Sequence, residues 1–348
     1  MAGRHSEQKD NIQFQLFLLE LFTKTDYNGV SMNILEYKSI GHPDSLTDYV
    51  AEEVSKFLND HYMKKYGEVK HYNVDNCLFQ SGTLDIGFNK CTVLSPPIFY
   101  LGGNIYNGND ALNEELFGVI GKAVRHIFPK LHIDIRMVYS STSDGLNHMS
   151  RIKGCNDTSF AVGFYPFTTQ EYLLLRLKDA IYGYILRHPV FGLDFKIMMV
   201  DTKEVIISIP QKVSMVTDWE QYHENMRKLK EFVQDVTRIE NVYVNPECNT
   251  ADDSTCWLVN HGSSIENGDS GSVGRGNNHY GFISSSRPST KEAYCGKNSV
   301  SHIGKIYQDL AMNMAKSEYE ADKHSKTVVM YNVVGNSVDY PVIDIMEE

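Results

Sequence analysis

Helical and extended patterns follow one another irregularly along this 348-residue sequence, and their order limits the folds it can adopt. Apolar residues recur at helical spacing in five segments, residues 45–58, 110–128, 169–186, 218–236 and 301–318. Two extended segments, 194–200 and 204–209, are expected to form a hairpin around a turn at 201–203. Because hairpins replace strict strand–helix–strand alternation, the pattern favours an α+β fold over a doubly wound parallel sheet.

The remaining segments add strands and loops to this outline. Further strands are predicted at residues 33–40, 131–139, 242–244, 255–260 and 327–334. Asp44 or Ser45 is expected to cap the first helix, and a threonine to open the helix at 169–186. Residues 72–106 predict a strand, a mobile loop and a second strand, and residues 140–156 predict a loop. Three strand-plus-helix blocks of comparable size are compatible with a degenerate threefold plan.

The glycine-rich stretch DSGSVGRGN at residues 269–277 carries the clearest chemical signal. Glycine lets backbone N–H groups approach anionic oxygens closely. The stretch has companions in Gly41-His42-Pro43-Asp44 and in Gly296-Lys297. A lysine, an arginine and a histidine supply positive charge, and two aspartates can carry a divalent cation. Together these segments can hold a polyphosphate and stabilise it as a leaving group.

Three familiar motifs do not explain the glycine-rich stretch. It lacks the Gly-Lys-Ser/Thr ending of a phosphate-binding P-loop, and no strand–loop–helix unit frames it as a dinucleotide fingerprint. The Gly-Asp-Ser-Gly at 268–271 has no histidine base with a supporting signature, and long amphipathic helices argue against a two-barrel serine protease. Taken alone, the stretch could be a tight turn, Lys297 a solvated lysine, and Asp194 with Lys196 a surface ion pair. Only their joint occurrence favours a binding site.

Composition and charge exclude several other classes of protein. The net charge of −11 disfavours nucleic acid as the main partner, since no basic run exceeds two residues. Six scattered cysteines without a CxxC motif argue against a zinc cluster or a disulfide framework and favour reduced thiols in a cytoplasmic protein. The apolar run at residues 16–22 is too short to span a bilayer and contains Glu20, so no membrane association is expected.

The joint pattern resembles the methionine adenosyltransferases, or S-adenosylmethionine synthetases, of the archaeal type. The matching segments are EYKSIGHPDSLTD at 36–48, HYNVD at 71–75, NDTSFAVGFYP at 156–166, GLDFKIM at 192–198, NTADD at 249–253, NGDSGSVGRGN at 267–277 and RPSTKEAYCGKNSVSHIGKIY at 287–307. The resemblance implies an N-terminal extension at 1–30, partly ordered, and a catalytic unit at 31–348. That unit would be built from three interleaved α+β subdomains with pseudo-threefold symmetry, mixed or antiparallel sheets and helices on the outer face.

The resemblance also implies a reaction and its partners. The sulfur of L-methionine would attack C5′ of ATP, and the released tripolyphosphate would then be hydrolysed to pyrophosphate and phosphate. Mg²⁺ would be required and K⁺ would assist. The protein would form a homodimer or a dimer of dimers, with its active sites at the subunit interface.

A set of site residues follows from the same resemblance. The residues implied for catalysis are His42, Lys196, Arg275 and Lys297. Those implied for binding ATP and its phosphates are Glu36, Asp194, Gly271, Ser272, Gly274, Gly276, His302 and Lys305. Asp157 and Asp269 would take the methionine ammonium, and Asp44 would hold Mg²⁺.

The sequence departs from the family pattern at several places. The gate loop reads QSGTLDIGF at 80–88 without its usual arginine, GDDG has become Gly-Asp-Ser-Gly at 268–271, and the second of two histidines is Tyr72. The chain is also shortened, with MVYS at 137–140 in place of an RPGS-like stretch. Two alternatives therefore stay open: a transferase for another thioether or nucleotide, and a non-catalytic subunit that binds ATP or S-adenosylmethionine.

Overall fold

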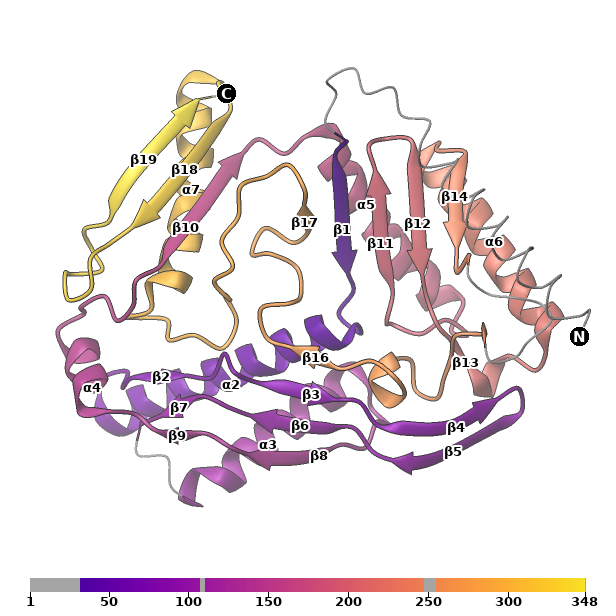
Figure 1. Ribbon diagram of the computed structural model, residues 1–348, viewed down its shortest axis with the longest axis horizontal. Helices are drawn as coiled ribbons and strands as arrows, with labels where there is room; N and C mark the ends of the chain where they lie inside the picture. The colour runs from indigo at the N-terminus through magenta and orange to yellow at the C-terminus, as the bar shows by residue number, and fades with distance from the viewer. Residues whose placement is uncertain (1–31, 107–109, 247–254, 348) are drawn as a thin grey trace, which may run out of the picture. The chain divides into compact units, whose positions relative to one another are not determined.

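The computed structural model of the chain describes residues 32–106, 110–246 and 255–347 (Figure 1). Two expectations, the extension at 1–30 and the NTADD segment at 249–253, lie outside the described residues. Every helix and strand described belongs to the second of two units, Ile34–Glu348. Hairpins, mixed sheets and interspersed helices make this unit an α+β fold, as the sequence predicts.

The first sheet contains the strand that leads into the GHPD motif. Its order is β14-β12-β11-β1-β17, and only the β12–β14 pair is parallel. The strands are β1 (Ile34–Lys38), β11 (Lys196–Val200), β12 (Glu204–Ser208), β14 (Asn241–Val244) and β17 (Ile283–Ser284). The register of β1 on β11 places Lys38 opposite Lys196. Helices α5 (Thr169–Arg187) and α6 (Trp219–Thr237) share one apolar core with this sheet (Figure 1).

The second group of strands packs with the helix that follows the GHPD motif. A four-stranded sheet has the order β16-β3-β6-β8, a three-stranded sheet the order β2-β7-β9, and β4 and β5 form a hairpin. The strands are β2 (Tyr72–Asn73), β3 (Leu78–Gln80), β4 (Thr83–Gly87), β5 (Lys90–Ser95), β6 (Ile98–Leu101), β7 (Asn104–Ile105), β8 (Asp134–Met137), β9 (Ser140–Ser141) and β16 (Gly271–Ser272). Helices α2 (Pro43–Tyr66) and α3 (Asp110–Ile127) enclose a second apolar core with these strands.

The third sheet, β10-β18-β19, packs against a single long helix. Its strands are β10 (Phe160–Tyr165), β18 (Lys326–Tyr331) and β19 (Val342–Glu347), and the helix is α7 (Ile303–Asp322). Shorter elements complete the described chain: α4 (Asp144–Arg151), η1 (Val213–Met215), η3 (Ser264–Glu266), β13 (Gln211–Lys212) and β15 (Leu258–Val259). The three sheet-and-helix groups interleave along the chain, because β16 joins the second sheet and the following β17 joins the first. A pseudo-threefold relation between them stays a prediction.

The strongest local patterns give the elements that they predict. Strands β11 and β12 form the expected antiparallel hairpin. Helix α5 opens with a capping box, in which Thr168 Oγ1 accepts the N–H of Glu171 at 3.2 Å and the Glu171 carboxylate accepts the N–H of Thr168 at 2.7 Å. Helix α6 is capped by Asp218, whose Oδ1 accepts the N–H of Gln221 at 2.9 Å.

Several other predictions are wrong. Helix α2 begins at Pro43 and is capped by His42, not by Asp44 or Ser45, because proline fits the first helical position and the imidazole takes the capping role. Residues 140–156 contain β9 and α4 instead of a loop. Ser143 caps α4, but it could not be recognised as a cap in so polar a segment. Residues 255–260 form only the two-residue strand β15, and the edge strand β19 has no predicted counterpart because it is exposed on both faces.

The expected mobile loop within residues 72–106 is the hairpin β4–β5, which is tied to its surroundings. The N–H of Ser81 donates to Ser270 Oγ at 3.0 Å, and the N–H of Leu84 donates to Asn267 Oδ1 at 3.1 Å. At the hairpin's tip, the Phe88 ring packs 5.7 Å from the ring of Trp219 on α6. The serine that replaces the second GDDG carboxylate therefore anchors this hairpin. None of the helices in the described ranges has the length and apolarity that a bilayer span needs.

Helix α7 lies so close to β10 that a side chain at Gly163 would overlap with the backbone at Ala311. We expect Gly163→Ala to lower the free energy of unfolding by about 1–3 kcal/mol, because the helix must shift to admit one methyl group. Urea unfolding measures this loss. Gly118→Ala is the control: Gly118 is exposed within α3 with no atom near its added methyl, so alanine should leave stability unchanged or raise it. Equal effects of the two substitutions would contradict the packing argument.

Candidate active site

The turn between β1 and α2 presents His42 and Asp44 at the start of a helix. Glycine is required at position 41, because a Cβ there would overlap with the backbone of Leu193. The N–H of His42 donates to the carbonyl of Ser39 at 3.0 Å, which closes the turn. Asp44 is 4 % exposed in the first turn of the helix. Both side chains therefore have fixed positions at a helix N-terminus, where anions are favoured.

The hydrogen bond of His42 determines where its proton lies. Its Nδ1 accepts from the backbone N–H of Asp44 at 3.2 Å, so a neutral ring carries its proton on Nε2. Burial lowers the pKa of His42 to about 4, Asp44 opposes this shift, and the charges of Lys38, Lys196 and Arg275 add to it. At neutral pH the ring is thus an uncharged donor beside three cations.

Lys38, which the sequence analysis did not select, lies at the centre of this group. Its Nζ is 3.0 Å from Asp44 Oδ2 and 3.8 Å from Glu36, and it donates to the carbonyl of Arg275 at 2.6 Å. Lys196 pairs with Glu36 at 3.0 Å. Lys38 and Glu36 lie two residues apart on β1 and so share a face of the strand. That spacing was the available signal for Lys38.

The glycine-rich stretch rests on the first turns of α2. The N–H of Ser272 donates to Asp44 Oδ1 at 3.0 Å, and the N–H of Gly274 donates to Asp48 Oδ1 at 2.8 Å. Glycine is required at 271, because a Cβ would overlap with the Pro43 carbonyl, and at 274, where φ is +79°. Burial raises the pKa of Asp48 to about 7, the Gly274 N–H opposes this, and Asp44 adds to it.

Lys297 and His302 form a second group with three carboxylates. Lys297 is 1 % exposed; its Nζ lies 2.9 Å from Asp75, contacts Glu292 and is 3.3 Å from His302 Nε2. His302 caps α7 as His42 caps α2, since its Nδ1 accepts the N–H of Gly304 at 3.2 Å. Burial and then Lys297 lower the pKa of His302 to about 4. Asp157, Glu292 and His302 offer ligand atoms within 4.8 Å of one another, an arrangement that could hold a metal ion.

Three further predicted residues are placed as follows. Lys305 is buried against Glu52 of α2, at 2.6 and 2.7 Å from its two oxygens. Asp194 is fully buried, and its Oδ2 accepts from the N–H of Ser264 at 2.8 Å; burial raises its pKa to about 7. Burial and then Asp44 raise the pKa of Asp269, which places that carboxylate near the first group. Lys305 and Asp194 therefore support the site from beneath its surface.

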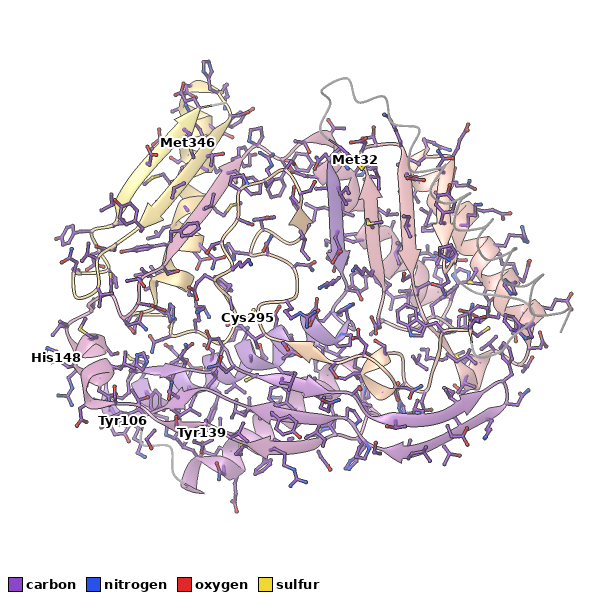
Figure 2. All side chains as sticks on the ribbon, in the orientation of Figure 1. Met32, Tyr106, Tyr139, His148, Cys295 and Met346 are labelled. Atoms are coloured by element: carbon purple, nitrogen blue, oxygen red, sulfur yellow. The ribbon has the colours of Figure 1, made fainter. Side chains whose placement is uncertain are left out.

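A polar cavity of about 220 Å³ lies beside α2, between the glycine-rich stretch and the segment that leads to Lys297. Its lining includes Asp48, Gly274, Glu292, Tyr294 and Cys295, and Figure 2 labels Cys295 there. Among the described residues, hydrogen bonds and ion pairs thus divide the site residues into two groups. One surrounds His42 and the glycine-rich stretch; the other surrounds Lys297 and His302.

Comparisons with known proteins identify the family of the chain. The family described as S-adenosylmethionine synthetase (AdoMet synthetase) matches residues 17–347. A probable S-adenosylmethionine synthase of Aquifex aeolicus is 31 % identical over 340 residues, 89 % of this chain and 84 % of the relative. S-adenosylmethionine synthases of Haloquadratum walsbyi and Pyrococcus furiosus are 34 % and 31 % identical, over 82 % and 94 % of this chain and 77 % and 87 % of theirs. The chain belongs to the S-adenosylmethionine synthetase family.

A solved structure supports the fold independently. The unusual S-adenosylmethionine synthetase from Campylobacter jejuni superposes with a TM-score of 0.64 and 17 % identity, covering 91 % of this chain and 81 % of that one. At this identity the likeness concerns the fold alone. It agrees with the α+β architecture of residues 34–347.

The buried His71 of the HYNVD segment predicts a pH dependence of stability. Its Nδ1 has no hydrogen-bond partner among the described residues, and burial lowers its pKa to about 4. The unfolded chain, with a pKa of about 6.5, binds this proton first, so His71 contributes stability above about pH 6.5 that is lost as the pH falls toward 4. His71→Leu should therefore gain stability relative to the parent protein over that range, as measured by urea unfolding at pH 7 and pH 5.

The control for this prediction is His132→Leu, because the His132 side chain is 82 % exposed. Its difference from the parent protein should stay constant with pH. A constant difference for His71→Leu as well would contradict the assignment of a neutral, buried ring.

Proposed function

We propose that this protein synthesises S-adenosylmethionine from ATP and L-methionine. The observation that carries the proposal is the group around His42: a neutral donor, three cations and a glycine-rich loop fixed on one helix, in a chain of this family. These are parts that bind a polyphosphate and stabilise charge as it leaves. The named relatives carry the same activity in their names.

The proposed reaction needs little proton transfer. A thioether is neutral and already nucleophilic, so its sulfur forms a bond to C5′ of ATP while the C5′–O bond breaks and tripolyphosphate departs. The barrier then depends on in-line positioning and on charge that builds on the bridging oxygen. The Nε2–H of His42 would donate to that oxygen, and Lys196 and Arg275 would neutralise the phosphates. Hydrolysis of the tripolyphosphate to pyrophosphate and phosphate would follow in the same site.

The second group completes the proposed site from another copy of the chain. In one chain, the contacts of Lys297 and His302 lie with Asp75, Asp157 and Glu292 rather than with the His42 group. A homodimer, or a dimer of dimers, with the site at the subunit interface would bring both groups to one ATP. Asp157 and Asp269 would then take the methionine ammonium.

The carboxylates of the site fit Mg²⁺. Asp44 and Asp269 lie close enough for Asp44 to raise the pKa of Asp269, a repulsion that a cation would relieve. Carboxylate and phosphate oxygens are the ligands that Mg²⁺ prefers. We assign Asp44 as a Mg²⁺ ligand; the ion would neutralise phosphate charge when bound, and K⁺ would assist. Cys77, Cys91, Cys155 and Cys295 are free thiols, which fits a cytoplasmic location.

Incubation of the purified protein with ATP, Mg²⁺ and methionine tests the proposal. Mass spectrometry should detect S-adenosylmethionine, and phosphate assays should detect equal amounts of pyrophosphate and phosphate. The hairpin β4–β5 corresponds to the gate loop that departs from the family pattern, and it is held by hydrogen bonds to Ser270 and Asn267. A panel of methionine analogues therefore belongs in the same experiment. Turnover of an analogue alone would favour the diverged transferase. Binding of ATP without any product would contradict the proposal and favour a non-catalytic subunit.

The role of His42 gives a separate prediction. Asparagine can replace histidine as a helix cap, because its side-chain oxygen also accepts the N–H of Asp44. It cannot place an N–H where His42 Nε2 lies. His42→Asn should therefore slow adenosyl transfer by about 100-fold and leave hydrolysis of added tripolyphosphate nearly unchanged. Parallel loss of both steps would show that His42 acts more broadly than proposed.

A further inference from the structure

One face of α2 carries three carboxylates at a spacing of four residues: Asp44, Asp48 and Glu52. Each accepts a backbone N–H from a loop of the site. Asp44 takes Ser272 at 3.0 Å, Asp48 takes Gly274 at 2.8 Å, and Glu52 takes Gly296 at 3.2 Å. Helix α2 thus anchors both the glycine-rich stretch and the loop at Gly296. Of the three carboxylates, only Asp44 has a role in the proposed function.

Asp48 contacts the glycine-rich stretch at the two residues that flank Arg275. Arg275 stands between Gly274, which Asp48 holds, and Gly276, where a Cβ would overlap with Asp48 Oδ2. From the other side, Lys38 Nζ holds the Arg275 carbonyl at 2.6 Å. The Arg275 N–H donates to the Ser272 carbonyl at 3.3 Å, which closes a tight turn. The backbone at Arg275 is therefore fixed on both sides.

We infer that Asp48 is a positioning residue that sets the Arg275 guanidinium for the leaving triphosphate, an inference that rests on the proposed function. Its Oδ1 holds the Gly274 N–H, and its Oδ2 lies over Gly276, where no side chain fits. Without this carboxylate, the turn loses the anchor at Gly274, and the Arg275 backbone keeps its contacts with Lys38 and with the Ser272 carbonyl. A displacement of about 1 Å in a positioning element can cost about 100-fold in rate.

Asp48→Asn tests this inference. The amide oxygen can still accept from Gly274, but the amide N–H₂ then faces the Gly276 backbone. The expected result is a fall in kcat for S-adenosylmethionine formation of about 100-fold, with KM for methionine nearly unchanged. Glu53→Gln is the matched control, because it removes the same charge from α2 at a position where Glu53 pairs with Lys56 at 2.8 Å. A kcat for Asp48→Asn within about twofold of the parent, or kcat and KM changing together, would overturn the inference.

A compensating pair keeps the test decisive if Asp48→Asn folds poorly. Gly276→Ala should lower kcat, because its methyl group collides with Asp48. Asp48→Ala combined with Gly276→Ala removes that collision, leaving Ser45 Cα as the nearest backbone atom at 3.4 Å. The double variant should turn over at least about tenfold faster than additivity predicts. Simple additivity would overturn the inference. A parent protein without transferase activity would instead overturn the proposed function, so the two failures are distinguishable.

Discussion

Replacing Lys297 by alanine is expected to lower kcat for S-adenosylmethionine formation by about 1,000-fold, with a much smaller change in KM for methionine. The Lys297 ammonium lies in a buried group with Asp75, Glu292 and His302. Its charge would be used on the departing tripolyphosphate, and an interaction made only in the transition state lowers kcat rather than substrate binding. Steady-state kinetics with varied methionine measures both quantities.

Two further variants control for damage to the buried group. Lys297→Met keeps most of the side-chain volume and should lose as much turnover as Lys297→Ala. Lys203→Ala removes a lysine whose side chain is 81 % exposed in the β11–β12 turn, and should change neither quantity. A rise in KM that matches the fall in kcat would contradict the assignment of Lys297 to the leaving group, as would full turnover of either Lys297 variant.

Replacing Arg287 by alanine is expected to lower the free energy of unfolding by about 3–5 kcal/mol. Arg287 donates to both oxygens of Glu171, at 2.7 and 2.8 Å, and to the carbonyl of Pro166 at 2.8 Å. Glu171 is fully buried, and its carboxylate also closes the capping box of α5. Truncation of Arg287 therefore leaves a buried charge without its cation. Urea unfolding of the two proteins measures the difference.

The exposed Arg227 on α6 provides the matched control. It pairs with Glu224 and Glu231, yet water surrounds all three side chains, so Arg227→Ala should leave the unfolding midpoint unchanged. Replacing both Arg287 and Glu171 with methionine should recover most of the lost stability, because no buried charge then remains. A loss below about 1 kcal/mol for Arg287→Ala would show that water reaches Glu171 and would contradict the burial argument.

The elements that local chemistry specifies could be predicted, and those that depend on distant contacts could not. Helix α5 follows from its amphipathic spacing and its threonine cap, and the β11–β12 hairpin from two apolar runs around a polar turn. The start of α2 was misjudged because aspartate and serine are commoner caps than histidine. Strand β19 was not predicted because it is exposed on both faces and, among the described strands, pairs with β18 alone.

In the site too, local motifs could be predicted and distant contacts could not. The resemblance selected His42, Arg275 and Lys297, but their sorting into two groups depends on contacts across more than 200 residues. Asp48 was not predicted because its partner is a backbone N–H of the glycine-rich stretch, which no side-chain motif records. Lys38 was not predicted although its spacing from Glu36 on one strand was visible in the sequence. The repeat of Asp44, Asp48 and Glu52 at helical spacing was visible in the sequence. Its role could not be predicted, because it depends on the loop N–H groups that these carboxylates accept.

A rapid-quench single turnover tests the central claim most directly. Excess protein would be mixed with ATP labelled in its γ-phosphate, with Mg²⁺ and methionine, and the labelled products separated at successive times. Direct attack at C5′ predicts that intact tripolyphosphate appears first, together with S-adenosylmethionine, and then gives way to pyrophosphate and phosphate. Labelled phosphate that appears with ADP, before any S-adenosylmethionine, would contradict the account, because ATP would then be cleaved at phosphorus rather than at carbon.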